Sequence, residues 1–66
     1  MNLEALWRKA AALLQQAGIE DAAFDARELC RMCCGADPLC APQAPVSEAA
    51  RRRLAQLCAR RAQHAP

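Results

Sequence analysis

Residues 3–18 read LEALWRKAAALLQQAG, and no other part of the chain has a clearer helical pattern. The apolar side chains recur at steps of three and four residues, which places them on one stripe of an α-helix. This stripe comprises Leu3, Leu6, Trp7, Ala10, Leu13, Leu14 and Ala17. Gly18 follows directly and suits the left-handed residue that ends a helix. The stretch therefore predicts an amphipathic helix, with Ile19 folded back onto its last turn.

The next segment predicts a second helix, from about Asp21 to Cys34. Asp21 is a suitable N-cap, and Gly35 is a second glycine at which a helix can stop. The expected buried stripe consists of Ala22, Ala26, Leu29, Cys30 and Cys33. Phe24 is expected to flank the core.

Residues 36–46 are interrupted by three prolines and predict a short helical turn followed by a compact loop. Asp37-Pro38 has the form of a cap followed by proline at the first helical position, so the turn should run through Cys40. Ser47 then caps a third long helix that reaches about Gln63. One face of this helix is shared by Ala50, Leu54, Leu57, Cys58 and Arg61. The other arginines point elsewhere, namely Arg51, Arg52, Arg53 and Arg60.

The composition supports an all-α fold. The chain has 17 alanines but a single valine, a single isoleucine and two glycines, which favours helices over strands. Its length allows one small domain with a thin core. We therefore expect residues 1–66 to form a single small helical bundle of three main helices plus a short helical turn.

The sequence also indicates the cellular compartment of the protein. It has no run of eighteen apolar residues that could span a membrane, and no layout typical of an export signal. We therefore expect a cytoplasmic protein, whose five cysteines are thiols rather than disulfides.

The cysteines are the first candidates for a chemical site. Zinc ligands are conceivable among Cys30, Cys33, Cys34, Cys40, Cys58 and His64. Structural zinc usually takes two Cys-x-x-Cys pairs from tight turns, whereas the only pair here falls in the middle of a helix, on its apolar stripe. A redox pair would need a helix N-terminus, and a coiled-coil-helix disulfide fold would need a second pair with the spacing of Cys30 and Cys40. The cysteines are therefore interpreted as core residues, with no metal ion.

The arginines are the second candidates, because charge is unevenly distributed along the chain. Residues 1–48 hold four basic and seven acidic side chains, whereas residues 49–66 hold five arginines and no acid. Such polarity can mark an electrostatic contact face for a protein partner or, alternatively, for nucleic acid. The absence of stacking aromatic residues near the arginines makes nucleic acid the weaker interpretation. His64 has no supporting nucleophile, and the chain contains no phosphate-binding loop, so no catalytic residue is assigned.

The order of these segments resembles a known family. The first segment is an amphipathic helix that ends in Ala17-Gly18-Ile19-Glu20. It is followed by Asp25-Ala26-Arg27-Glu28-Leu29 and an apolar run up to Gly35. The last segment is a long helix that opens with Val46-Ser47-Glu48 and ends in Arg60-Arg61-Ala62. This order is similar to that of the N-terminal domain of the HemK/PrmC-type release-factor glutamine methyltransferases. The resemblance covers essentially the whole chain. The sequence differs from the family in having cysteines where leucines are usual, and His64-Ala65-Pro66 where Gly-Glu-Pro is usual.

The resemblance implies a substrate-recognition domain without catalytic or cofactor residues of its own. In this family a later domain binds S-adenosylmethionine and methylates the glutamine side chain in the Gly-Gly-Gln loop of peptide-chain release factors. The implied partners are the release factor and that catalytic domain, and Arg52 and Arg53 are the expected partner-binding residues. The helix that stops near Ala65, before Pro66, agrees with a domain cut from a longer protein. A free-standing helical interaction module is the alternative, followed by a small basic nucleic-acid-binding protein.

Overall fold

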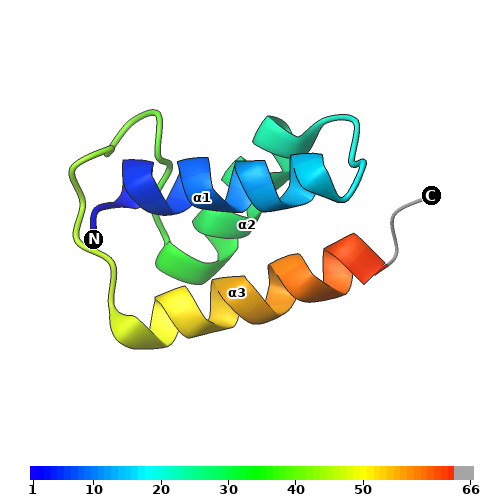
Figure 1. Cartoon of the computed structure of the whole chain (residues 1–66). Coiled ribbons are helices and arrows are strands. Elements are labelled where there is room, and N and C mark those ends of the chain that lie inside the picture. Colours follow the sequence, from blue (N-terminus) through cyan, green and yellow to red (C-terminus); the bar gives the residue numbers. More distant parts are fainter. Residues whose placement is uncertain (64–66) are drawn as a thin grey trace.

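A computed structural model describes residues 1–63 of the chain. It contains helices α1 (Leu3–Gln16), α2 (Ala22–Cys34) and α3 (Glu48–Gln63). Figure 1 shows α1 and α3 running in the same direction. Helix α2 runs in the opposite direction, from the end of α1 towards the start of α3, and packs against both. The described residues form no strand, so the predicted all-α bundle is confirmed. No helix among them has the length and apolar character needed to cross a bilayer. The predictions made for His64 and for the helix end at Ala65 lie outside the described residues.

The start of α1 is tied to the proline-rich loop that precedes α3. The first amide groups of a helix have no partner within it, so other groups must accept their hydrogen bonds. Here the Leu3 amide donates to the carbonyl of Ala44 at 2.9 Å, and the Glu4 amide donates to the carbonyl of Pro42 at 3.0 Å. The Asn2 side chain accepts from the Ala5 amide at 2.9 Å. The loop is therefore part of the folded structure, in agreement with the predicted compact loop.

Glycines follow the C-terminal ends of α1 and α2. Gly18 has φ +86° and Gly35 has φ +67°, a conformation that L side chains rarely adopt. After Gly18, the Ile19 amide donates to the carbonyl of Leu14 at 3.1 Å, and the Ile19 side chain is buried. Both predicted helix ends are thus confirmed. At the start of α2, Asp21 occupies the N-cap position but makes no side-chain capping hydrogen bond.

The predicted turn after Asp37 is also present, and an ion pair secures it. Arg27 of α2 binds both carboxylate oxygens of Asp37, with Nε–Oδ1 at 3.0 Å and Nη2–Oδ2 at 2.6 Å. Asp37 Oδ1 also accepts from the Leu39 amide at 2.9 Å. The bonds from Arg27, followed by that from Leu39, lower the pKa of Asp37 from 3.8 to about 2. Asp37 therefore remains charged through the physiological range and joins α2 to the turn.

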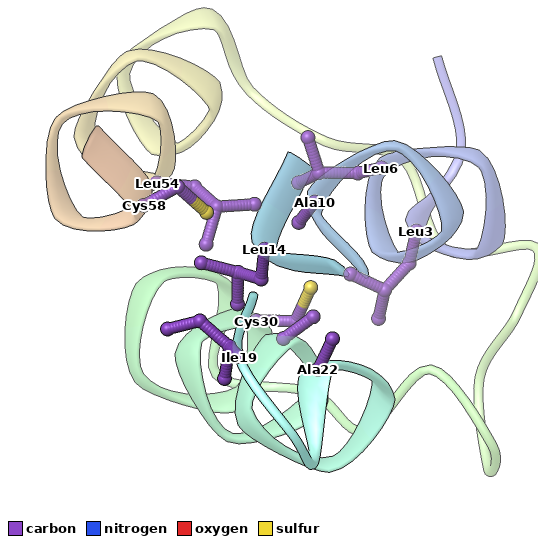
Figure 2. Packing of buried hydrophobic residues seen from close by; sticks show 10 residues of the cluster. Leu3, Leu6, Ala10, Leu14, Ile19, Ala22, Cys30, Leu54 and Cys58 are labelled. Atoms are coloured by element: carbon purple, nitrogen blue, oxygen red, sulfur yellow. The ribbon is translucent and has the colours of Figure 1, made fainter. Parts of the chain in front are cut away.

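The core lies where the three helices meet. Its buried apolar residues are Leu3, Leu6, Ala10, Leu14, Ile19, Ala22, Ala26, Cys30, Leu54 and Cys58. Figure 2 shows Leu14 of α1 between the α3 side chains Leu54 and Cys58 and the Ile19 side chain. The predicted apolar stripes thus supply this core, with alanine and cysteine filling the close approaches between helices.

Two expected core residues are placed differently in the structure. Leu13 is 51% exposed and Phe24 is 56% exposed, so the predictions that they belong to or flank the core are wrong. Leu14, one step of 100° further around α1, occupies the position that faces both other helices. Phe24 lies in the first turn of α2, next to Ala23, whose carbonyl accepts a hydrogen bond from the Trp7 indole at 2.8 Å. Trp7 therefore closes this end of the α1–α2 interface, and Phe24 remains at the surface.

Candidate functional site

The outer surface of α3 carries the largest group of basic side chains. The helix begins as predicted, because Ser47 Oγ accepts a hydrogen bond from the Ala50 amide at 3.1 Å. Leu54 and Cys58 are buried against α1 and α2, which fixes the rotation of the helix. Three arginines consequently lie on exposed positions away from the core, namely Arg52, Arg53 and Arg60. The sequence-predicted residues Arg52 and Arg53 are therefore both accessible.

Glu48 is the one acidic side chain on α3, and it pairs with two of the arginines of this helix. It forms a bidentate pair with Arg51, one arm of which joins Arg51 Nε to Glu48 Oε2 at 3.1 Å. The Arg51 hydrogen bond lowers the pKa of Glu48, and the same bond raises the pKa of Arg51. Arg52 Nε lies 3.5 Å from Glu48 Oε1, but its side chain is 72% exposed. A contact this exposed is worth little and is easily exchanged for another carboxylate.

Arg53 differs from its neighbours because it has no acidic partner among residues 1–63. An exposed guanidinium offers five N–H donors in a planar fork that matches a carboxylate. Arg52 and Arg53 together therefore form a cationic surface on the first half of α3. The chemistry that suits this surface is the binding of acidic side chains.

Arg61 has a different role, because it links α3 to α2. Its Nη2 lies 2.9 Å from Asp25 Oδ2, and its Nε lies 3.2 Å from the same oxygen. The sequence placed Arg61 on the core-facing side of α3, and the structure adds the partner on α2. Arg61 is therefore paired with a residue of another helix, unlike Arg52 and Arg53.

A groove between α1 and α3 was not found from the sequence. It encloses about 90 Å³ and is lined by Met1, Leu6, Lys9, Ala10, Leu13, Arg51, Leu54, Ala55 and Cys58. Most of these side chains are apolar, while Lys9 and Arg51 supply a cation from each side. The exposure of Leu13 follows from this arrangement, because α3 does not cover the α1 surface at that point. The sequence feature behind the groove is the small size of Ala10 and Ala55. This feature predicts a groove only when it is known that the two helices pack side by side.

The cysteines do not form a second site among residues 1–63. All five are free thiols, and no group of three or more Cys, His, Asp or Glu side chains in this part of the chain is arranged to hold a metal ion. Burial raises the pKa of the Cys30 thiol to about 12, with smaller effects from Cys34, Cys58 and Cys33. Burial also raises the pKa of Cys58. Activated thiols need the opposite shift, so Cys30 and Cys58 act as small apolar core residues. Cys40 is exposed in the turn after α2, so its interpretation as a core residue is wrong.

Comparison with known proteins agrees with this architecture. The family model described as the PrmC N-terminal domain matches residues 5–66 of the chain. No curated protein and no solved structure matches the chain significantly. The family match covers α2, α3 and all of α1 except its first two residues, and so includes the arginine-rich surface. The chain therefore belongs to the PrmC N-terminal domain family.

Proposed function

We propose that this domain recognises a peptide-chain release factor on behalf of a protein-glutamine methyltransferase. The modified residue is the glutamine of the release factor's Gly-Gly-Gln loop, and the methyl donor is S-adenosylmethionine bound by a separate catalytic domain. The residues described here bind no cofactor in this proposal and perform no catalytic step. The enzyme acts in the cytoplasm, where its substrate is found.

The observation that carries this proposal is the pair of exposed arginines on a member of the PrmC N-terminal domain family. Methylation of one glutamine on a large protein requires that side chain to be held in line with the methyl donor. Contacts far from the reacting atoms can supply this positioning by holding the substrate in place on the enzyme. Arg52 and Arg53 suit such a remote contact, because they are fixed on a helix and project away from its core face.

The electrostatics of α3 favour a protein partner with an acidic surface. Arginine pairs with carboxylates through two parallel hydrogen bonds, which adds geometric specificity to the attraction. Complementary charge also accelerates association, more strongly at low salt than at high salt. Nucleic-acid recognition commonly adds aromatic side chains that stack on bases, and α3 contains none. The same surface could serve a free-standing interaction module, which would bind an acidic protein without methylating it.

The direct test is charge reversal in the complete enzyme. The double variant Arg52→Glu/Arg53→Glu should raise KM for the release factor by about tenfold and leave kcat nearly unchanged. The matched control is Arg8→Glu/Arg31→Glu, which reverses two exposed arginines on α1 and α2, each of which contacts a glutamate of its own helix as Arg52 does. Its KM should stay close to that of the wild type. An unchanged KM in the first variant would contradict release-factor docking through α3.

A further inference from the structure

We propose that the groove between α1 and α3 receives one apolar side chain from an acidic segment of the docked partner. The identification of that partner as a release factor rests on the proposed function, whereas the chemistry of the segment is argued from the groove itself. Arg52 and Arg53 would then steer and orient the partner, and the groove would anchor it.

The shape of the groove suits a single aliphatic side chain. Its floor is formed by the buried residues Leu6, Ala10, Leu54 and Cys58. Ala10 and Ala55 end at Cβ, so α1 and α3 leave an unfilled volume of about 90 Å³ between them. A dry apolar cavity of ~150 Å³ can hold a benzene molecule, so the smaller space here fits a branched or unbranched aliphatic side chain.

The mouth of the groove is apolar and exposed. Met1 is 58% exposed and Leu13 is 51% exposed, and each lines the groove on the α1 side. Exposed apolar side chains that line a concavity are typical of contact sites, whereas isolated ones are ordinary surface. Methionine also adapts its shape to different partners. An inserted side chain would therefore be covered on its outer side by Met1 and Leu13.

Positive charge at the rim of the groove favours acidic residues on either side of the partner's inserted side chain. Lys9 lines the groove from α1 and has no acidic partner among residues 1–63. Arg51 lines it from α3, and Arg52 shares with Arg51 their single acidic partner, Glu48. Two cations, Lys9 and Arg51, therefore line the groove, Arg52 follows Arg51 in the helix, and Glu48 is the one carboxylate paired with these three side chains. An acidic segment can therefore place an apolar side chain in the groove with its carboxylates towards Lys9 and Arg52.

The test compares two substitutions that add the same side chain to the same helix. Ala55→Leu fills the groove, and Ala59→Leu adds an equal volume one turn further along α3, at an exposed residue outside the groove lining. Binding of a purified release factor is measured by titration calorimetry. Ala55→Leu should weaken binding by tenfold or more, whereas Ala59→Leu should change it by less than twofold. Equal affinity for the two variants would overturn the proposal.

A second variant covers the case in which Ala55→Leu disturbs the fold. Leu13→Ser removes an exposed apolar side chain from the rim, so the bundle should remain intact, as circular dichroism would confirm. This variant should weaken binding by about fivefold. If Leu13→Ser binds as the wild type does, the rim takes no part and the proposal fails.

A peptide probe separates failure of this inference from failure of the proposed function. The probe is a synthetic peptide of glutamate and alanine with one central leucine, and its control has serine at that position. The leucine peptide should shift the amide NMR signals of Lys9 and Ala55, and the serine peptide should not. If the release factor fails to bind while the leucine peptide binds, only the proposed partner is wrong. If neither peptide shifts these signals, or if the groove instead joins two copies of the chain in sedimentation, the groove inference is wrong.

Discussion

The pair formed by α1 and α2 differs from α3 in how each is attached to the rest of the molecule. The α1–α2 pair supplies most of the buried residues and is closed by the hydrogen bond from Trp7 to Ala23. By contrast, α3 contributes only Leu54 and Cys58 to the fully buried set, with the Arg61–Asp25 ion pair near its end. The α1–α2 pair is therefore the structural base of the bundle. The third helix is held by few contacts and presents most of its surface to solvent.

This difference explains why charge and groove both lie along α3. A helix that buries only a narrow stripe leaves many positions free for solvent-exposed arginines. Incomplete coverage of α1 by α3 also leaves Leu13 exposed and the groove open. The weaker attachment thus provides the surface to which we assign partner binding, while the α1–α2 pair keeps it in place.

The largest expected effect comes from the main attachment of α3. Leu54 is 1% exposed, so Leu54→Ala removes a fully packed side chain and should cost about 2–5 kcal/mol of unfolding free energy. For a domain of this size such a loss is a large part of the total stability. Urea denaturation followed by circular dichroism would measure it. The control Leu13→Ala alters a half-exposed leucine and should cost less than about 1 kcal/mol. Similar costs for the two would contradict the assignment of Leu54 as the anchor.

A smaller effect is expected from the bond that closes the α1–α2 pair. Trp7→Phe keeps an aromatic ring but removes the indole N–H that donates to the Ala23 carbonyl, and should cost about 1 kcal/mol. Thermal unfolding would detect this as a lower melting temperature. The comparison variant Phe24→Leu changes an exposed ring on α2 and should have almost no effect. A Trp7→Phe variant as stable as the wild type would show that this bond does not hold the pair together.

The pH dependence of stability should report the Arg27–Asp37 pair. The pKa of Asp37 is lower in the folded chain, about 2, than its ordinary value of 3.8. Its ionised form therefore stabilises the fold above pH 3.8, and this contribution is lost as the pH falls from 3.8 towards 2. The stability difference between the wild type and Asp37→Asn should be constant at neutral pH and shrink over that acidic interval. A difference independent of pH would mean that the carboxylate charge contributes nothing.

The smallest expected effect belongs to the ion pair between α2 and α3. The Arg61 side chain is 46% exposed, so solvent screens its attraction to Asp25. Arg61→Ala should cost no more than about 1 kcal/mol, and less at high salt. Denaturation at low and high ionic strength would show this difference. A cost as large as that of Leu54→Ala would reverse our account of how α3 is attached.

The helices and their ends could be predicted from the sequence because they depend on local chemistry. Gly18, Gly35 and Ser47 act through backbone conformation and hydrogen bonds that involve only nearby residues. The periodic stripes likewise identified Leu14, Cys30 and Leu54 as buried. Apolar residues at steps of three and four identify the buried side of a helix but not how far that side extends around it. The same pattern therefore also placed Leu13 in the core.

The parts that could not be predicted depend on how the helices meet. The Arg27–Asp37 and Arg61–Asp25 pairs join residues 10 and 36 positions apart, and no local pattern connects them. The groove arises because Ala10 and Ala55 face a common space, which their positions in the sequence do not reveal. The exposure of Arg52 and Arg53 was predictable, since it follows from the burial of Leu54 on the same helix.

The central claim is that α3 and the groove beside it form the partner-binding surface of this domain. The most direct measurement is an amide NMR titration of the isotope-labelled chain with an unlabelled release factor. We predict that signals from Lys9, Arg52, Arg53 and Ala55 shift or broaden first, while those of the exposed α2 residues Phe24 and Met32 remain unchanged. Changes confined to α2, with α3 unaffected at saturating release factor, would contradict the account.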